Sequence, residues 1–403
     1  MAGTWIEVNL DAVVGNYQEV IKYLRPEARC MAVVKADAYG LGAVEVARAL
    51  EGAGCEAFAV TRVEEGLILR EHGIERLILV LGPTTKEEWP KAISAHLQLT
   101  LSELSSISEL NEICSNMELE PQQNVQMHIK VETGMGRTGF RLSELGELIA
   151  ALSSAPHLKV AGVYTHFARA AQRDQPYTLR QYERFEEFTA RLEEGGIHPV
   201  WKHVCNSAAF LDHPEWHHDF VRIGTLLIGH YPGQGFSGKL RLEDPWTAIS
   251  QIVHLRKVPK GTDVGYQSIY HTKKETQLAV IPVGYADGFG VAPHFVPQGG
   301  IDFIKIVVKN FVALFGIYLG QERVELKGRT VRVAGKIGMQ LTVLDVGMME
   351  CALGEEVKLP LRRTVANPRI LRRYRKDGQM LSERVIEEGI MPIYTEDSHS
   401  VQS

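Results

Sequence analysis

A lysine at the end of an apolar run is the first feature of the sequence that needs a chemical explanation. Residues 31–42 read MAVVKADAYGLG, so Lys35 follows a run typical of a buried strand and precedes small residues and a glycine pair. A lone strand-end lysine usually extends toward solvent, and lysine is almost never buried without a partner. A lysine amine can also form an imine with a carbonyl compound, which gives this position a candidate catalytic role.

Further polar groups follow other apolar runs of the chain. They comprise an amine, two guanidinium groups, an imidazole and a hydroxyl beside glycine amides: Lys130 and Arg137, His166, Asn206 and Ser207, Arg222 and Gly224. If the runs are the strands of a parallel barrel, these groups meet at its carboxyl end. An imine-forming lysine opposite donors for a phosphate predicts a site for pyridoxal 5'-phosphate.

The elements that must position these residues alternate regularly up to about residue 235. Eight short apolar runs recur there: CMAVVK, AFAV, LILVLG, LQLTL, VQMHIKV, VAGVYTHF, VWKHVCN and FVRIG. Amphipathic helical patterns lie between most of them, over residues 42–50, 62–72, 102–116, 143–152 and 178–194. This alternation predicts an α/β fold, a closed (β/α)8 TIM barrel. An open doubly wound sheet is the alternative, but no G-x-G-x-x-G motif follows the first run.

The pattern changes after the glycine-rich segment YPGQGFSG. Stretches such as QLAVIPVGYADG and RVELKGRTVRVAGKIG are rich in β-formers and are separated by turn residues. We therefore predict two domains, a cofactor-binding barrel over residues 1–235 and a mainly β domain over residues 236–403.

The overall composition argues against nucleic-acid and membrane partners. The formal net charge is −5 and no dense basic run occurs, so we expect a small-molecule ligand. The first residues do not resemble a signal peptide, and no apolar run reaches about 18 residues. Five scattered cysteines without a C-x-x-C pair suggest reduced thiols, and we expect a cytoplasmic protein. The histidines of HPEWHH lack the H-E-x-x-H arrangement, so we expect no metal site.

Seven motifs together resemble the bacterial alanine racemases. They occur in the same order as in that family, over residues 30–288: AVVKADAYGLG, VETGMGRTGF, GVYTHFA, CNSAA, VRIG, VGYQSIY and PVGYADG. The resemblance implies a pyridoxal-phosphate barrel followed by a β domain, working as a head-to-tail homodimer with shared active sites. It also implies interconversion of L-alanine and D-alanine, which supplies D-alanine for peptidoglycan.

The resemblance assigns the two catalytic bases. Lys35 matches the lysine that binds the cofactor and then acts as one base, and Tyr266 matches the opposing base, supplied by the partner subunit. Inversion at Cα requires a base on each face, because the proton leaves from one side and returns to the other. A tyrosine is a weak base, so cationic neighbours must stabilise its phenolate, and Arg137 and His166 match the family residues of that network.

Other functional positions of the family also have counterparts in this sequence. Arg222 matches the arginine that donates to the pyridine nitrogen, and a guanidinium that keeps its proton leaves that ring largely unprotonated. Lys130 matches a lysine that is carbamylated in many members. Tyr285 matches a residue near the substrate entrance. The phosphate-binding positions are matched by Tyr39, Ser207, Gly224 and Thr225.

The C-terminal part departs from the family pattern. Met339 keeps a substrate-binding position, but Gln340 stands where many members carry an aspartate, and the segment 293–326 is longer than expected. A racemase of other amino acids, such as serine or lysine, is therefore an alternative. A pyridoxal-phosphate decarboxylase of basic amino acids shares the barrel-plus-β layout and is a further alternative, although it would not explain the Tyr266 motif.

Overall fold

The computed structural model describes residues 3–117, 124–291, 300–313, 322–385 and 393–396. The chain forms two compact units, one over Leu10–Pro245 and the other combining Met1–Asn9 with Trp246–Ser403.

In its described part, the first unit contains eight parallel strands that close into a barrel. Two four-stranded sheets, in the orders β4-β3-β2-β9 and β5-β6-β7-β8, are joined on both sides by backbone hydrogen bonds, from Gln98 to Ile78 and from Asp219 to Lys202. The eight predicted strands are thus confirmed, as β2 (Arg29–Val33), β3 (Ala57–Val60), β4 (Leu77–Val80), β5 (Leu99–Leu101), β6 (Val125–Lys130), β7 (Leu158–Tyr164), β8 (Trp201–His203) and β9 (Phe220–Ile223).

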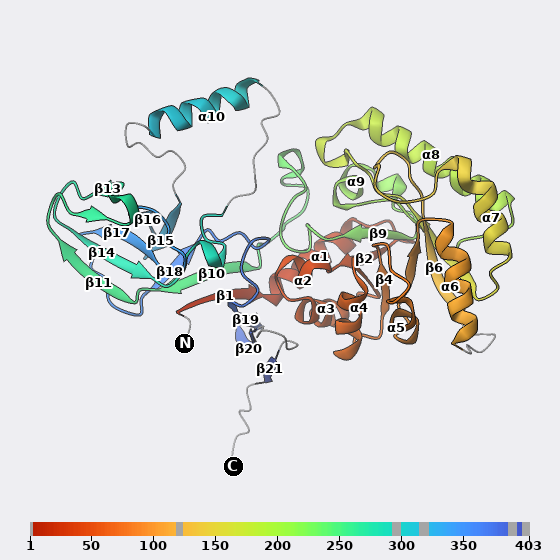
Figure 1. Ribbon diagram of the computed structural model, residues 1–403, viewed down its shortest axis with the longest axis horizontal. Coiled ribbons are helices and arrows are strands. Elements are labelled where there is room, and N and C mark those ends of the chain that lie inside the picture. Colours follow the sequence, from red (N-terminus) through yellow and green to blue (C-terminus); the bar gives the residue numbers. More distant parts are fainter. Residues whose placement is uncertain (1–2, 118–123, 292–299, 314–321, 386–392, 397–403) are drawn as a thin grey trace, which may run out of the picture. The chain divides into compact units, whose positions relative to one another are not determined.

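Helices cover the outside of this barrel (Figure 1). Both faces of each strand are consequently buried, which explains why strands such as β3 are continuously apolar instead of alternating. The helices are α1 (Leu10–Tyr23), α2 (Lys35–Tyr39), α3 (Ala43–Gly52), α4 (Val63–Glu71), α5 (Trp89–Ser94), α6 (Ser105–Asn116), α7 (Leu145–Ser153), α8 (Gln175–Glu194) and α9 (Ser207–Asp212), with 3-10 turns at Leu142–Glu144, Ala170–Gln172, Pro214–Trp216 and Gln234–Phe236.

The described strands of the second unit form one large sheet and a small hairpin. The sheet has the order β11-β14-β17-β16-β15-β18-β10-β1-β19-β20-β21, and the hairpin pairs β12 with β13. The strands are β1 (Thr4–Asn9), β10 (Trp246–Gln251), β11 (His254–Val258), β12 (Asp263–Val264), β13 (Tyr270–His271), β14 (Thr276–Ile281), β15 (Arg323–Leu326), β16 (Arg329–Val333), β17 (Thr342–Gly347), β18 (Glu356–Leu359), β19 (Leu371–Lys376), β20 (Gln379–Val385) and β21 (Ile393–Glu396), with 3-10 turns at Tyr266–Ser268 and Tyr285–Asp287.

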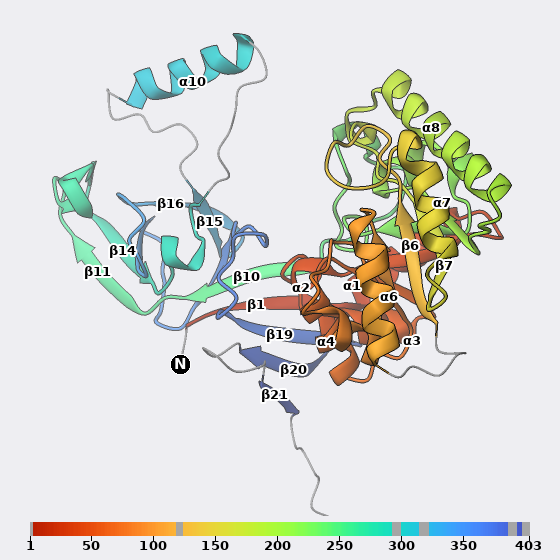
Figure 2. The ribbon, with the colours of Figure 1, turned by 45° about the vertical axis from the view of Figure 1, so that its right-hand side comes forward.

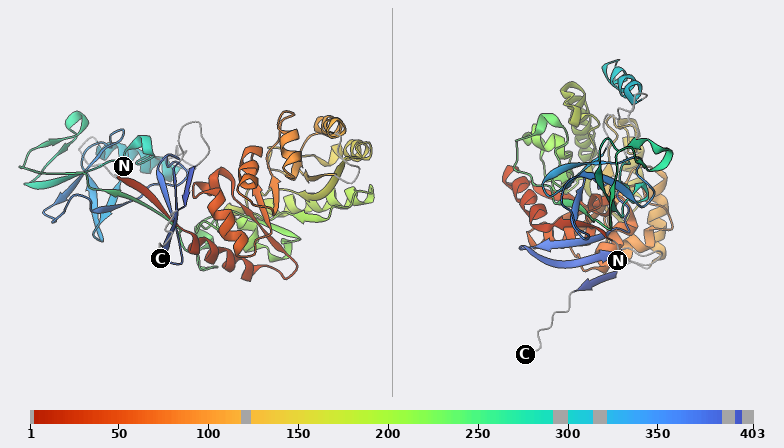
Figure 3. Two further views of the ribbon diagram at one scale, coloured as in Figure 1. Left: turned by 90° about the horizontal axis from the view of Figure 1, so that it is seen from below. Right: turned by 90° about the vertical axis from the view of Figure 1, so that its left-hand side faces the viewer.

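Strand β1 belongs to this second unit although it opens the chain. It pairs antiparallel with β10, where Trp5 lies opposite Ile249, and parallel with β19, where Trp5 lies opposite Leu371 (Figures 2 and 3). The structure therefore divides the chain differently from the single boundary predicted at residue 235. The first residues lie outside the barrel because both edges of β1 are occupied by strands from the C-terminal part. The barrel unit itself continues to Pro245.

One helix, α10 (Gly300–Ala313), interrupts the β-rich second unit. It lies within the segment that the sequence showed to be longer than expected, and its large exposed side chains are Phe303, Ile304, Val307, Val308 and Phe311. The sequence around it is rich in β-forming residues and predicts no helix. None of the described helices is both long and apolar enough to cross a lipid bilayer.

Candidate active site

Lys35 begins an unusual backbone turn. The next four residues, Ala36 to Tyr39, all have left-handed φ values between 50° and 58°. Left-handed backbone costs roughly 1–2 kcal/mol per non-glycine residue, so such a turn persists only where the surrounding structure holds it. This turn brings the side chains of Lys35 and Tyr39 to the wall of one cavity.

Two carboxylates hold this turn. Asp37 Oδ1 accepts the backbone N–H of Ala43 at 2.8 Å. The Glu65 carboxylate accepts three backbone N–H groups, those of Ala36 at 2.5 Å, Thr61 at 2.8 Å and Arg62 at 3.0 Å. Glu65 therefore connects the turn after β2 to the loop after β3.

Replacing Glu65 by alanine is expected to loosen this turn. Three backbone donors lose a charged acceptor, and we expect a loss of about 1–3 kcal/mol in the free energy of unfolding. Cofactor affinity should fall as well, because Lys35 and Tyr39 are no longer held. Urea unfolding and cofactor titration measure the two effects. Glu64→Ala, which changes the exposed neighbouring carboxylate, is the control, and equal behaviour of the two variants would contradict this role of Glu65.

The cavity beside Lys35 lies at the carboxyl ends of the barrel strands and measures about 670 Å³. All ten barrel residues predicted for the site line it: Lys35, Tyr39, Lys130, Arg137, His166, Asn206, Ser207, Arg222, Gly224 and Thr225. Four of them are cationic side chains. No carboxylate occurs among the described residues of the lining, so the cavity is suited to an anionic ligand.

The electrostatics of the cavity favour a neutral amine at Lys35. Burial lowers the pKa of Lys35 below its usual value, and the nearby Arg137 guanidinium lowers it further, although Glu65 acts in the opposite direction. A neutral amine is the form that attacks a carbonyl carbon or accepts a proton.

A small cradle lies where Gly224 meets Tyr39. Any Cβ at position 224 would overlap the Tyr39 phenol oxygen, so only glycine allows this close approach. Among the described residues, nothing hydrogen-bonds to the buried hydroxyl of Thr225. Ser207, which lines the same cavity, begins α9, and the Asn206 cap of this helix accepts the N–H groups of Ala208 and Ala209 at 3.1 Å. An unsatisfied buried hydroxyl in a cationic cavity is the environment expected at a phosphate site.

Arg222 is a buried cation held by neutral acceptors. Its two Nη atoms donate to the carbonyl oxygens of His203 and Thr165 at 2.6 Å and of Val204 at 3.2 Å, and Nη1 also donates to His203 Nδ1 at 2.8 Å. Burial lowers its pKa to about 10, which leaves it protonated at neutral pH. No ion pair with Arg222 occurs in the described part of the chain, so its charge remains available to the cavity.

Lys130 is a second buried cation. Its Nζ donates to the Val131 carbonyl at 2.9 Å and lies 5.6 Å from the centre of the Tyr164 ring. Burial and the Arg222 charge lower its pKa to about 7, while Glu132 raises it and Arg137 lowers it further. The unprotonated amine of Lys130 is therefore accessible near neutral pH.

Arg137 and His166 also line the cavity. Glu132 accepts the backbone N–H of Gly134 at 2.5 Å and of Arg137 at 3.3 Å and so shapes the loop that carries Arg137. Burial lowers the pKa of His166 well below its usual value, and the charge of Arg222 adds to this effect, so its imidazole is neutral.

Tyr164 and Thr138 are among the residues that line the cavity but were not predicted from the sequence. Tyr164 stacks on His203 with ring centres 4.8 Å apart, and the Arg222 guanidinium lies 5.1 Å from its ring centre. It stands inside the quoted segment GVYTHFA, at the last position of β7, so the rule that selected strand ends could have found it.

The other three predicted residues, Tyr266, Tyr285 and Met339, lie in the second unit. Their side chains are exposed by 72%, 50% and 59%. Gln267, which follows Tyr266, has a left-handed φ of 62° and accepts a hydrogen bond from Lys336 Nζ at 2.5 Å. The backbone N–H of Tyr285 donates to the Gly338 carbonyl at 3.0 Å, which places Tyr285 beside the loop of Met339.

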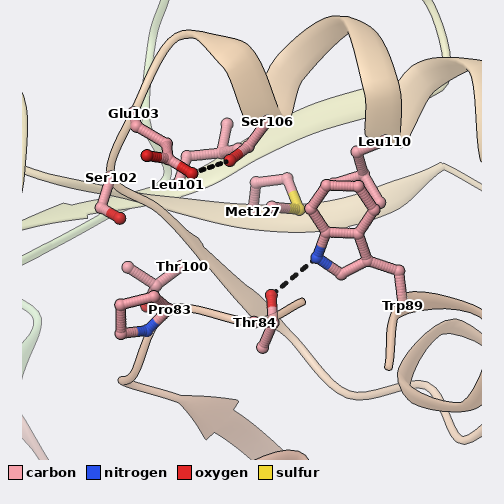
Figure 4. A pocket seen from close by; sticks show the side chains of 10 residues that line it. All are labelled: Pro83, Thr84, Trp89, Thr100, Leu101, Ser102, Glu103, Ser106, Leu110 and Met127. Atoms are coloured by element: carbon pink, nitrogen blue, oxygen red, sulfur yellow. Dashed lines mark hydrogen bonds between the residues drawn. The ribbon is translucent and has the colours of Figure 1, made fainter. Parts of the chain in front are cut away.

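A smaller hollow at the end of β5 is not the active site (Figure 4). The Trp89 indole donates to Thr84 at 2.7 Å and Ser106 donates to Glu103 at 3.1 Å across it. Its volume is about 10 Å³, which is room for a single water molecule.

Comparison with known proteins agrees with this geometry. Residues 8–232 match the family model "Alanine racemase, N-terminal domain", and residues 246–368 match "Alanine racemase, C-terminal domain". The alanine racemase of Desulforamulus reducens is 36% identical over 88% of both chains, and that of Carboxydothermus hydrogenoformans is 40% identical over 72% of this chain and 77% of its own length.

Solved structures give the same result. Alanine racemase from Clostridium difficile 630 superposes with a TM-score of 0.84 at 28% identity, covering 95% of this chain and 98% of its own. Alanine racemase from Bacillus anthracis with bound L-Ala-P gives 0.81 at 28% identity, covering 95% and 97%. From its sequence matches and its barrel with a cationic cavity, the chain belongs to the alanine racemase family.

Proposed function

We propose that this protein interconverts L-alanine and D-alanine with pyridoxal 5'-phosphate bound beside Lys35, and that the D-alanine serves peptidoglycan synthesis. The observation that carries the proposal is the cavity itself, which combines an amine of lowered pKa with three further cations and no lining carboxylate in the described residues. When bound, the cofactor would withdraw electrons from the substrate and acidify its Cα–H bond.

The residues present fit this cofactor. The unsatisfied Thr225 hydroxyl, the close approach of Gly224 to Tyr39, and Ser207 would hold the phosphate. Arg222 would face the ring nitrogen. A guanidinium can only donate hydrogen bonds, so it would leave that nitrogen unprotonated.

Two groups would move the Cα proton. Lys35 Nζ would remove or return it on one face, and the Tyr266 phenol would act on the other face. The high exposure of Tyr266 in its own chain supports its delivery to a partner's barrel, and we therefore propose a homodimer with shared active sites. Cytoplasmic location remains a prediction from the sequence.

Lys130 is proposed to be carbamylated. Its neutral amine would attack carbon dioxide, form the N–C bond and release one proton, which converts the buried neutral amine into a carbamate anion. The anion would be stabilised by the nearby Arg222 and Arg137 charges.

The modification gives a testable prediction. With ¹³C-bicarbonate, the wild-type protein should show a carbamate carbon signal that grows as pH rises through about 7, because only the unprotonated amine reacts. Lys130→Met should lack the signal, and Lys159→Met, at an exposed lysine, should keep it. A signal that survives Lys130→Met would place the carbamate elsewhere.

The function is tested by incubating the protein and cofactor with each L-amino acid and resolving the products on a chiral column. D-alanine as the main product supports the proposal. Predominant D-serine or D-lysine would favour the broader racemase, and carbon dioxide release from lysine or ornithine without racemisation would favour a decarboxylase.

A further inference from the structure

A row of hydrogen-bonded side chains runs through the barrel core to Arg222. We call it the histidine relay, and it consists of Gln98, His128, His203 and Arg222. Gln98 Oε1 lies 2.7 Å from His128 Nε2, His128 Nδ1 lies 2.8 Å from His203 Nε2, and His203 Nδ1 lies 2.8 Å from Arg222 Nη1. Both imidazoles are fully buried.

The relay crosses the barrel from end to end. Gln98 immediately precedes β5, at the amino end of the strands, where it lines a cavity of about 370 Å³ that is separate from the active site. Its backbone bonds to Ile78 and Val80 at 2.9 Å and joins the two halves of the barrel. Arg222 stands at the other end of the relay, in the wall of the active-site cavity.

The direction of every hydrogen bond in the relay follows from its arginine end. A guanidinium can only donate, so His203 Nδ1 must accept and His203 Nε2 must carry the hydrogen. That hydrogen is donated to His128 Nδ1, which leaves the hydrogen of His128 on Nε2, facing Gln98. Of the two amide atoms only the oxygen accepts, so Gln98 Oε1 is the terminal acceptor.

Because both histidines are neutral, only this placement of their hydrogens is compatible with Arg222 as a donor. Burial, with the charge of Arg222, lowers the pKa of His128 to about 3 and holds that of His203 well below its usual value. Each ring therefore has one N–H. The opposite arrangement would set a His203 N–H against an Arg222 N–H, and the resulting repulsion would turn the guanidinium away from its carbonyl acceptors.

We propose that Gln98 is a positioning residue for the reaction: as the terminal acceptor it stabilises the same tautomers of His128 and His203 that Arg222 requires, and it thereby holds Arg222 in its orientation toward the cofactor. This role rests on the proposed function. Gln98 acts through three side chains and does not reach the active-site cavity, so its loss should affect the reaction without removing any group that touches the substrate.

The test combines histidine NMR with kinetics on the full chain. In ¹⁵N-histidine-labelled wild-type protein, before and after addition of pyridoxal 5'-phosphate, both His128 and His203 should be single Nε2–H tautomers. Gln98→Leu should give mixed tautomers at His128 and lower kcat about tenfold, with a smaller change in KM, because a buried donor loses its acceptor. Gln98→Glu keeps an acceptor oxygen and should restore the single tautomer and kcat at alkaline pH.

Gln126 provides the matched control, since it lines the same cavity as Gln98 but takes no part in the relay. Gln126→Leu should leave tautomers and kcat unchanged. An Nδ1–H tautomer at His128 in the wild type, or unchanged tautomers in Gln98→Leu, would overturn the proposal, even if kcat fell. If the wild type fails to racemise alanine, the NMR spectra still determine the direction of the relay, so the two proposals fail separately.

Discussion

Replacing Tyr266 by phenylalanine is expected to abolish racemisation and leave cofactor binding nearly intact. General acid-base groups typically contribute 10²–10⁴-fold to rate, so we expect a loss in kcat of roughly that size. The loss should be unequal in the two directions. Exchange of the α-hydrogen of L-alanine with solvent should be suppressed, whereas exchange in D-alanine should persist if, as proposed, Lys35 is the base on the other face. Proton NMR in deuterated water measures both.

The matched control is Tyr23→Phe, which removes a phenol oxygen that lies 3.4 Å from the Leu211 carbonyl in the barrel unit. Exchange in both isomers should continue at the wild-type rate in this variant. Equal suppression of both isomers by Tyr266→Phe, with cofactor still bound, would argue against a base on each face.

The same variant tests whether the site is shared. Inactive Tyr266→Phe and Lys35→Ala chains, mixed and allowed to exchange subunits, should regain activity. In each mixed dimer, the barrel that keeps Lys35 receives the wild-type Tyr266 from its partner, so about a quarter of all sites are intact after random assortment. If Tyr266 served its own barrel, no intact site would arise and the mixture would stay inactive.

The barrel could be predicted from sequence because its signal is local. Each strand is a short apolar run, since parallel strands covered by helices are buried on both faces, and the predicted polar residues follow directly from the ends of those runs. The eight residues chosen in this way all line one cavity for this reason, and Tyr39 and Thr225, which the family resemblance added, line it too. The catalytic and cofactor-binding roles of these residues came from the family resemblance, because the arrangement of side chains alone does not assign them.

Features that depend on distant partners gave no such signal. Strand β1 has its place because β10 and β19 pair with its two edges, and nothing within residues 4–9 indicates this pairing. The left-handed turn after Lys35 contains no glycine from Ala36 to Tyr39 and is held by Glu65, which lies on another helix.

The histidine relay shows the same limit at the level of side chains. Gln98, His128 and His203 belong to three different strand regions, and any one of them alone would be read as an ordinary core or surface residue. Their relation appears only when the barrel closes and brings β5, β6 and β8 around one axis. Because Arg222 can only donate, it then determines the direction of the hydrogen bonds in the histidine relay.

Lys35 gives the prediction with the largest effect on the cofactor. Lys35→Ala should not turn yellow with pyridoxal 5'-phosphate, and borohydride treatment of the wild type should fix the label on Lys35 alone. Lys91→Ala, at an exposed lysine, should bind and react as the wild type does. A label on another residue would refute the assignment.

The pH dependence of cofactor capture follows from the lowered pKa of Lys35. Only the neutral amine attacks the cofactor, so the rate of covalent attachment should rise with pH and level off above the Lys35 pKa, which lies below the usual 10.5. Burial is the largest cause of this lowering and Arg137 the second. Arg137→Met removes that positive charge and should shift the curve toward higher pH, whereas Glu65→Gln removes a negative charge and should shift it toward lower pH. Stopped-flow absorbance measures the three curves. Shifts in the same direction for both variants would mean that the charges around Lys35 do not control its reactivity.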